Sequence, residues 1–316
     1  MNDMLARSPL ACYSFSSSKG TSFRVCYQDK SGNIKQTCYD GQGPWHSSPN
    51  GIIGRANLNN GIAITGWAEG NEERVYYVGE DDTIVERCWS SRKSRWNDGE
   101  LTGQFTAAHY SNLAVLSFAN NAGIWYIRVY YQGKDNTIRE CCRDGEGAWF
   151  AGHSFPVAMA GTTIAAISIP GNPCCFWVFY QKPDTTFIQY STQGSGGWRV
   201  GSFKSQLVYE PGAYITCASD GKPMHRIFTI DRDNKLCVTE GSNDASSWTQ
   251  TKQLTMTIPS SPAAATAATR GVNLYGHYDL AVRVYIQTNP GQISEWGTGS
   301  GLGEEYRLLR SQLPTN

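Results

Sequence analysis

The strongest constraint on the fold is a short phrase that recurs along the chain at a nearly constant interval. The clear copies are TSFRVCYQDKSGNIKQ (21–36), EERVYYVGEDDTIVE (72–86), YIRVYYQGKDNTIRE (126–140) and AVRVYIQTNPGQISE (281–295), with weaker copies at 175–189 and 225–238. Their lead residues at 24, 74, 128, 177, 226 and 283 are separated by 50, 54, 49, 49 and 57 positions. Such an interval predicts a solenoid, a propeller or another array of similar units.

Two further features repeat in step with this phrase. A tryptophan follows it at 45, 96, 149, 198 and 248, and a run poor in large side chains precedes it, from LACYSF (10–15) to PAAATAAT (262–269). Strands of small residues suit the crowded centre of a radial array. About four strands in each unit therefore predict an all-β fold, a six-bladed β-propeller. Two stacked β-sandwiches would not explain the even spacing.

We expect one domain that fills the chain, residues 1–316. Its blades are expected at 10–58, 59–108, 109–160, 161–209, 210–258 and 259–316.

The composition agrees with short strands and tight turns, and it excludes some functions. Aromatic residues make up 12% of the chain, glycine contributes 33 residues, and charged residues make up only 17%. Lys plus Arg and Asp plus Glu number 27 each, so the positive charge of a general nucleic-acid binder is missing. No run of about 20 apolar residues is present, so we expect no membrane insertion. No secretory signal is visible in the first residues.

Metal binding and disulfide formation are not expected. The ten cysteines lack any C-x-x-C spacing and most lie in apolar, strand-like runs, which favours buried reduced thiols. The five histidines, at 46, 109, 153, 225 and 277, are scattered singly. We therefore expect no metal and no other cofactor.

An arginine and an acidic or amide residue stand 12 positions apart in four of the repeats. The pairs are Arg24 with Gln36, Arg74 with Glu86, Arg128 with Glu140 and Arg283 with Glu295. Each midpoint falls in a turn, so the two residues are expected to face each other across a β-hairpin. A guanidinium that donates in a plane beside an acceptor matches vicinal sugar hydroxyls, which both donate and accept.

The alternative is a cross-strand ion pair that only steadies a blade, worth about 0.2–1 kcal/mol. The repeat favours a site, because the fourth unit (Trp177, Gln189) and the fifth (Arg226, Val238) keep the strand pattern without the pair. The repeated tryptophans have a core-packing alternative. Their Gly-, Ser- and charge-rich surroundings instead predict exposed indole platforms for the apolar face of a sugar.

The R-V-Y-x-Q…N-x-I-x-E phrase with its trailing tryptophan resembles the fungal fucose-specific lectins of the Aleuria-lectin type, over essentially the whole chain. The resemblance implies L-fucose in clefts between blades, with Arg and Glu from one blade and two aromatics from the next. Carried over by position, the implied residues are Arg24, Gln36, Trp89 and Trp96 in the first cleft, Arg74, Glu86 and Trp149 in the second, Arg128, Glu140 and Trp198 in the third, and Arg283, Glu295, Tyr39 and Trp45 in the cleft that closes the ring.

Several positions depart from the family pattern. Gln36 drops the charge of the usual glutamate, so weaker hydrogen bonds are expected in the first cleft. Arg143 and Thr192 stand where an aromatic is usual in the second and third clefts. The fourth cleft (Trp177, Gln189, Gly241, Trp248) and the fifth (Arg226, Val238, Thr298) depart further, and no fucose is expected there.

Two other functions compete with a non-catalytic, multivalent lectin that agglutinates red cells. A propeller glycosidase usually needs two carboxylates about 5–9.5 Å apart, whereas each repeat offers one beside an arginine. A protein-interaction propeller of the WD40 or kelch kind would show Trp-Asp or double-Gly motifs, which are missing. The expected partners are L-fucose and fucosylated glycans, and the resemblance leaves a homodimer and a cytoplasmic, cell-surface or spore-surface location open.

Overall fold

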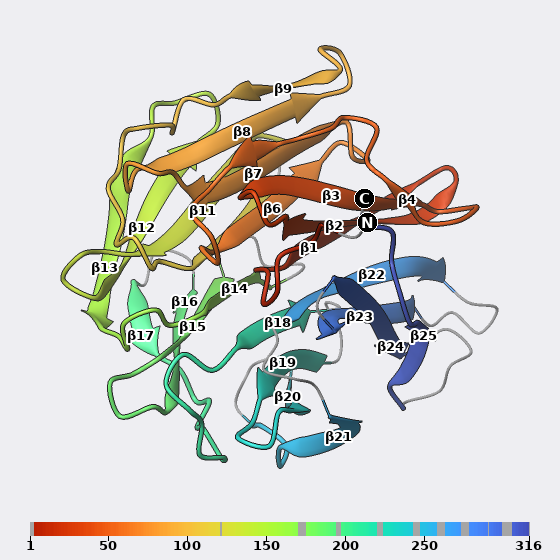
Figure 1. Ribbon diagram of the computed structural model, residues 1–316. Coiled ribbons are helices and arrows are strands. Elements are labelled where there is room, and N and C mark those ends of the chain that lie inside the picture. Colours follow the sequence, from red (N-terminus) through yellow and green to blue (C-terminus); the bar gives the residue numbers. More distant parts are fainter. Residues whose placement is uncertain are drawn as a thin grey trace.

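The computed structural model describes residues 3–120, 122–169, 175–193, 197–219, 224–242, 247–257, 263–272, 278–289, 291–298 and 305–315. These residues form six antiparallel sheets arranged around a central axis (Figure 1). In each sheet four strands follow one another in sequence order, and the first blade carries one short extra strand. The predicted all-β, six-bladed propeller is confirmed.

The strands of the first three blades follow one another from the axis outward. They are β1 (Ala11–Ser17), β2 (Gly20–Gln28), β3 (Asn33–Asp40), β4 (His46–Ser47) and β5 (Gly54–Arg55); β6 (Ile62–Trp67), β7 (Glu72–Val78), β8 (Ile84–Ser90) and β9 (Arg95–Asp98); and β10 (Leu113–Ala119), β11 (Trp125–Gln132), β12 (Thr137–Asp144) and β13 (Phe150–Val157).

The last three blades follow the same order. They are β14 (Ile164–Ser168), β15 (Cys175–Gln181), β16 (Phe187–Gln193) and β17 (Trp198–Val200); β18 (Ile215–Ser219), β19 (Met224–Ile230), β20 (Lys235–Ser242) and β21 (Lys252–Thr257); and β22 (Ala263–Val272), β23 (Tyr278–Asn289), β24 (Gln292–Thr298) and β25 (Arg307–Arg310). No helix long and apolar enough to cross a membrane occurs in the described ranges.

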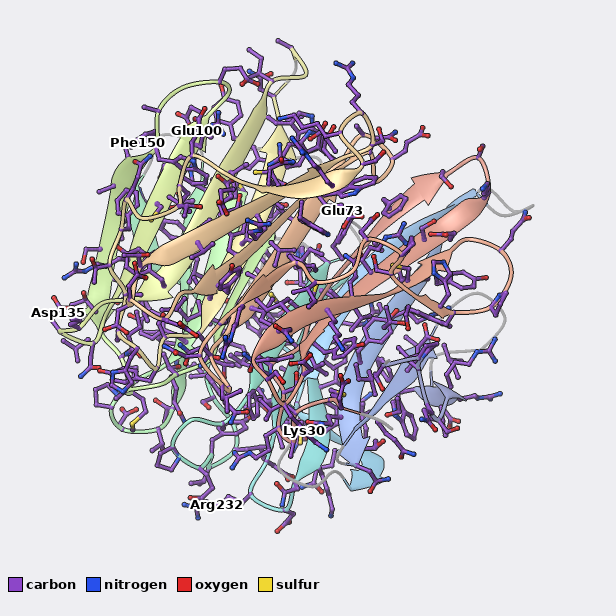
Figure 2. All side chains as sticks on the ribbon, turned by 45° about the horizontal axis from the view of Figure 1, so that its top comes forward. Lys30, Glu73, Glu100, Asp135, Phe150 and Arg232 are labelled. Carbon is purple, nitrogen blue, oxygen red and sulfur yellow. The ribbon has the colours of Figure 1, made fainter. Side chains whose placement is uncertain are left out.

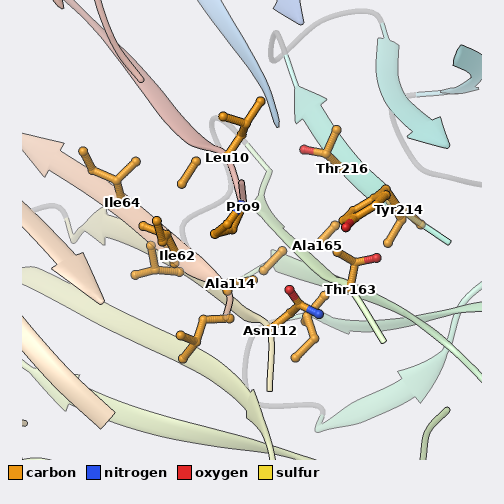
Figure 3. A pocket seen from close by; sticks show the side chains of 18 of the residues that line it. Pro9, Leu10, Ile62, Ile64, Asn112, Ala114, Thr163, Ala165, Tyr214 and Thr216 are labelled. Atoms are coloured by element: carbon orange, nitrogen blue, oxygen red, sulfur yellow. The ribbon is translucent and has the colours of Figure 1, made fainter. Parts of the chain in front are cut away.

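The small-residue runs form the innermost strands, as predicted. Each of β1, β6, β10, β14, β18 and β22 lies beside the innermost strands of both neighbouring blades. A cavity of about 130 Å³ lies at this centre. Figure 3 shows side chains that line it, among them Pro9, Ile62, Asn112, Thr163 and Tyr214. Small side chains are required at the axis because the inner strands converge and large ones would clash.

The hydrophobic core is divided among the junctions between blades. A separate cluster of buried side chains fills each of the six junctions, including the one between the sixth blade and the first. Each blade therefore buries both faces of its sheet against its neighbours, which leaves the ring without a free sheet face.

In four blades a glutamine at or near the end of the second strand locks one blade to the next. Nε2 of Gln132 donates to the carbonyls of Asn136 (3.2 Å) and Met159 (3.0 Å), and its Oε1 accepts from the Gly161 amide (2.9 Å). Gln28, Gln181 and Gln287 make equivalent bonds to the segment that begins the following blade. For Gln287 that segment is the N-terminal one, at Leu5 and Ser8, so this side chain helps to close the ring.

The nine cysteines in the described ranges are free thiols, and all but Cys12 and Cys88 are buried; Cys174 lies outside those ranges. Burial raises the pKa of the Cys38 and Cys142 thiols to about 12. A thiol that stays protonated at neutral pH is a poor nucleophile.

Candidate functional site

The arginine and the acidic residue of each repeat are diagonal neighbours on one face of the hairpin. In the second blade Arg74 pairs with Cys88, and Glu86 pairs with Tyr76. The first, third and sixth hairpins have the same offset. The prediction that the two residues face each other directly was wrong, because the turn between Val78 and Ile84 is centred one residue beyond the assumed midpoint.

A tyrosine directly opposite the glutamate holds its carboxylate. Oε1 of Glu86 accepts from the Tyr76 hydroxyl at 2.9 Å, and Oε2 accepts from the Leu101 amide at 3.1 Å. Glu140 accepts from the Tyr130 hydroxyl (2.9 Å) and Glu295 from that of Tyr285 (3.3 Å). All three glutamates are buried. Each carboxylate oxygen can still accept a further bond, because it has two lone pairs.

The arginines bind the backbone with one nitrogen. In all four predicted pairs, one terminal nitrogen of the arginine donates to the carbonyl of the preceding residue and to the carbonyl 15 positions later: for Arg74 these are Glu73 (2.9 Å) and Trp89 (3.3 Å). Arg24, Arg128 and Arg283 repeat this arrangement. The rest of each guanidinium is thereby held at a fixed orientation relative to the hairpin.

Aromatic rings that were not predicted as site residues also support the arginines. Arg74 lies over the Trp67 ring at 4.8 Å, Arg24 over Phe15 at 5.0 Å and Arg128 over Phe118 at 5.6 Å. These rings lie at or near the ends of β6, β1 and β10, so the aromatic that ends the first three small-residue runs was the available signal.

A tryptophan from the following blade lies next to each of these hairpins. Trp149 packs against Tyr76 (ring centroids 6.2 Å), Trp198 against Tyr130 (6.1 Å) and Trp45 against Tyr285 (5.8 Å). The arrangement of Arg and Glu from one blade with an indole from the next is thus present at three junctions. Exposed indoles were predicted, and this was wrong. Trp96 and Trp149 are 9% and 6% exposed because they pack into the junction cores, and Trp45, Trp198 and Trp248 are partly buried against the same kind of core.

The second cleft combines an open cavity with donors that the protein does not use. A cavity of about 850 Å³ is lined by Arg74, Glu100, Trp125 and Arg143, among others. Nε of Arg74 and Nε1 of Trp149 are buried without a hydrogen-bond partner. Buried donors without partners are rare in folded proteins, so these two indicate a polar ligand.

Arg143 takes the place of the second aromatic in this cleft. Its guanidinium lies 3.0 Å from Oε2 of Glu100 on the second blade, in a pair that spans the cleft. In the third cleft Thr192 pairs with Trp198 on the neighbouring strand, and Arg128 contacts Asp144 at 2.8 Å.

Of the four predicted pairs, all of which lie in the described ranges, only Arg283 and Glu295 in the ring-closing cleft form an ion pair with each other. Nε of Arg283 lies 3.5 Å from Oε1 of Glu295, and both side chains are buried. Burial raises the pKa of Glu295, while Arg283, the Tyr285 hydroxyl and Trp45 oppose that shift. Tyr39 and Trp45 lie together, with ring centroids 5.7 Å apart.

The first cleft differs in its polar contacts. Glu73 of the second blade, which was not predicted as a site residue, lies 3.2 Å from Nε of Arg24 and accepts from the Gln36 amide at 2.9 Å. Glu73 is buried, at the junction between the first two blades (Figure 2). Trp89 and Trp96 pair on neighbouring strands of the same junction.

The fourth and fifth clefts lack the arrangement, as predicted. Trp177 packs against Trp248 (5.8 Å) and His225 (4.2 Å), which makes the fourth junction aromatic. In the fifth blade Arg226 contacts Glu240 directly opposite it, at 3.2 Å. Glu240 was not predicted because it lies 14 positions after the arginine, outside the repeated spacing. No cluster of His, Cys, Asp and Glu able to hold a metal ion was found in the described ranges, which exclude His277.

Comparisons with known proteins agree with this geometry. The profile of the family described as fungal fucose-specific lectin matches residues 4–314. A fucose-specific lectin of Aleuria aurantia is 29% identical over 310 residues, which cover 95% of this chain and 94% of that protein. The crystal structure of Aleuria aurantia lectin, a six-bladed β-propeller, has a TM-score of 0.84 at 26% identity and covers 100% of this chain and 98% of that one.

A mutant of the same lectin in complex with Fucα1-6GlcNAc gives a TM-score of 0.83 at 26% identity, with 100% and 98% covered. Sequence profile and overall fold agree over nearly the whole length. The chain belongs to the fungal fucose-specific lectin family.

Proposed function

We propose that this chain is a multivalent lectin that binds L-fucose and fucosylated glycans without catalysis. The observation that carries the proposal is the second cleft, where the unused donors of Arg74 and Trp149 are buried at the same junction as the Glu86 carboxylate. Sugar hydroxyls donate and accept, so they can satisfy both kinds of group. The crystal complexes of Aleuria aurantia lectin with fucosides support this choice of ligand.

We assign three clefts to fucose. Each combines arginine and glutamate from one blade with tryptophan from the next: Arg74, Glu86 and Trp149; Arg128, Glu140 and Trp198; Arg283, Glu295 and Trp45, with Tyr39 beside it. Several weak sites on one molecule raise the avidity for a glycan-covered surface by about 10²–10⁴. A homodimer would increase it further, and light scattering of the purified protein would show twice the mass of one chain.

Binding rather than hydrolysis follows from the charges in each cleft. A glycosidase usually places two carboxylates on opposite sides of the bond that it cleaves. In this chain the oxygens of the hairpin glutamate are already held by a tyrosine and, in the second and third clefts, by a backbone amide. The other glutamate of the second cleft, Glu100, is 66% exposed and paired with Arg143.

The test is a calorimetric titration with free L-fucose, with D-glucose as the control sugar. We expect saturable heat with more than one site per chain for fucose and none for glucose. A chromogenic fucoside should release no product. Absence of heat with fucose, or release of product, contradicts the proposal.

A further inference from the structure

One position distinguishes the first cleft from the three assigned to fucose. The residue just before the lead position of the repeat in the following blade, which is an arginine or, in the fourth blade, Trp177, forms part of each junction. At the three assigned junctions it is buried and apolar: Ile127, Phe176 and Phe23. At the first junction it is Glu73, which is 4% exposed. The first cleft also has Gln36 in place of the glutamate.

The two differences fit each other. Glu73 Oε2 accepts from the Gln36 side-chain amide at 2.9 Å, and Oε1 lies 3.2 Å from Nε of Arg24. A glutamate at position 36 would place a second carboxylate against Glu73, and like charges at this distance repel. In the first cleft the carboxylate beside the arginine therefore comes from the second blade, as Glu73, and position 36 of the first blade carries an amide.

We infer that Glu73 is a built-in acceptor that occupies Nε of Arg24 and the Gln36 side-chain amide and prevents fucose from binding in the first cleft. Of the four side chains predicted for that cleft, only Trp89 and Trp96 keep a buried N–H group without a partner. This inference rests on the proposed function, and it restricts fucose to the other three clefts. It replaces the expectation from sequence for Arg24, Gln36, Trp89 and Trp96. In the second cleft the equivalent nitrogen, Nε of Arg74, has no protein partner, whereas Nε of Arg24 does.

Fucose would have to displace the Glu73 carboxylate, which comes from the following blade and lies 3.2 Å from Nε of Arg24. In the ring-closing cleft the carboxylate near Nε of Arg283 is Glu295 of the same hairpin, at the longer distance of 3.5 Å. A neutral sugar hydroxyl would replace a charged partner on Arg24, and hydrogen bonds between two charged groups are stronger than those to neutral ones. The displaced Glu73 would also remain buried without its partners, which is strongly unfavourable. Burial already raises the pKa of Glu73, and Arg24 and Gln36 oppose that shift.

Arg24 does not depend on Glu73 alone. Its other terminal nitrogen lies 2.9 Å from Asp40, a half-exposed carboxylate on β3. Removing Glu73 therefore leaves the guanidinium paired and frees Nε, which reproduces the state of Arg74 in the second cleft.

The direct experiment needs no variant. A crystal of the natural protein is soaked with L-fucose, and occupied clefts are counted. We expect sugar density in the second, third and ring-closing clefts and none beside Arg24. Fucose in the first cleft beside an unmoved Glu73 would overturn the inference. If no cleft holds fucose, this result contradicts the proposed function and not the inference about Glu73.

A gain-of-function experiment tests the cause. In a chain carrying Arg74→Ala, Arg128→Ala and Arg283→Ala, we expect no heat with L-fucose. Adding Gln36→Glu and Glu73→Ile should restore one saturable site per chain, since these residues supply the counterparts of Glu86 and Ile127 in the second cleft. Cys26 stands opposite position 36 where the second cleft has Tyr76, so this site should be weaker than the natural second cleft. Glu73→Ile without Gln36→Glu is the matched control, because it opens the cleft without supplying a carboxylate, and it should bind at least tenfold more weakly. Saturable heat before the two substitutions, or none after them in a protein that unfolds cooperatively, would overturn the inference.

Discussion

Tyr76 lies directly opposite Glu86 across β7 and β8, and its hydroxyl donates a 2.9 Å hydrogen bond to the carboxylate. The same relationship joins Tyr130 to Glu140 and Tyr285 to Glu295. The tyrosine of the repeated phrase is therefore a positioning residue for the acceptor. A carboxylate held in this way needs no reorientation when a ligand binds, which lowers the entropic cost of binding.

Replacing Tyr130 with phenylalanine should weaken the third cleft. The loss of one hydrogen bond to the carboxylate corresponds to about 1 kcal/mol, or about a fivefold decrease in fucose affinity. Calorimetry in a chain whose other clefts carry Arg74→Ala and Arg283→Ala measures this directly. The matched control is Tyr27→Phe, because the Tyr27 hydroxyl is buried without a hydrogen-bond partner. Equal losses in both variants would contradict the positioning role.

Replacing Arg74, Arg128 and Arg283 together with alanine should abolish fucose binding and haemagglutination. Each arginine also donates to two backbone carbonyls, so we expect a lower melting temperature in a protein that still folds. Single replacement by lysine should also weaken binding, since lysine lacks the planar fork. Arg55→Ala is the control, because Arg55 is 66% exposed and lies outside the clefts. Undiminished agglutination by the triple variant would refute the assigned sites.

Replacing Arg143 with tyrosine should strengthen the second cleft. The substitution restores an aromatic wall where the family has one, and aromatic contacts contribute about 0.5–1.5 kcal/mol. The ion pair lost with Glu100 contributes little, since the Glu100 side chain is 66% exposed. Calorimetry should show a several-fold lower dissociation constant. Glu100→Gln alone should leave it unchanged, and a weaker cleft in Arg143→Tyr would show that Arg143 itself contacts the sugar.

Fucose binding in the ring-closing cleft should weaken on acidification. Burial raises the pKa of Glu295 above its usual value of about 4.3, so protonation removes the charged acceptor at a higher pH than for an exposed glutamate. The effect on the free energy of unfolding has the opposite sign. The contribution of Glu295 to stability is fully present below the pKa that Glu295 has in the unfolded chain, and it is lost as the pH rises through the raised pKa of the folded protein. Titrations between neutral and acidic pH in a chain with Arg74→Ala and Arg128→Ala measure the binding. Glu295→Gln should remove the pH dependence, and an unchanged profile in that variant would exclude Glu295 as its cause.

The sequence determined the fold and most of the residues at the candidate site. A repeat of about 50 residues with a small-residue run and a late tryptophan fits a propeller, because each unit must bury both faces against similar neighbours. Departures from the repeat also located the fourth and fifth clefts, where Trp177 and Val238 break the pattern. These conclusions depend on local pattern and period, which a single chain displays directly.

Only the tertiary structure decided which groups are available to a ligand. The turn centre placed Tyr76, not Arg74, opposite Glu86. Packing at the junctions buried Trp96 and Trp149, and contact between two blades brought Glu73 to Arg24 across 49 positions of sequence. Such contacts join residues from different repeats, and their outcome depends on three-dimensional distance and burial, which spacing along the chain does not encode.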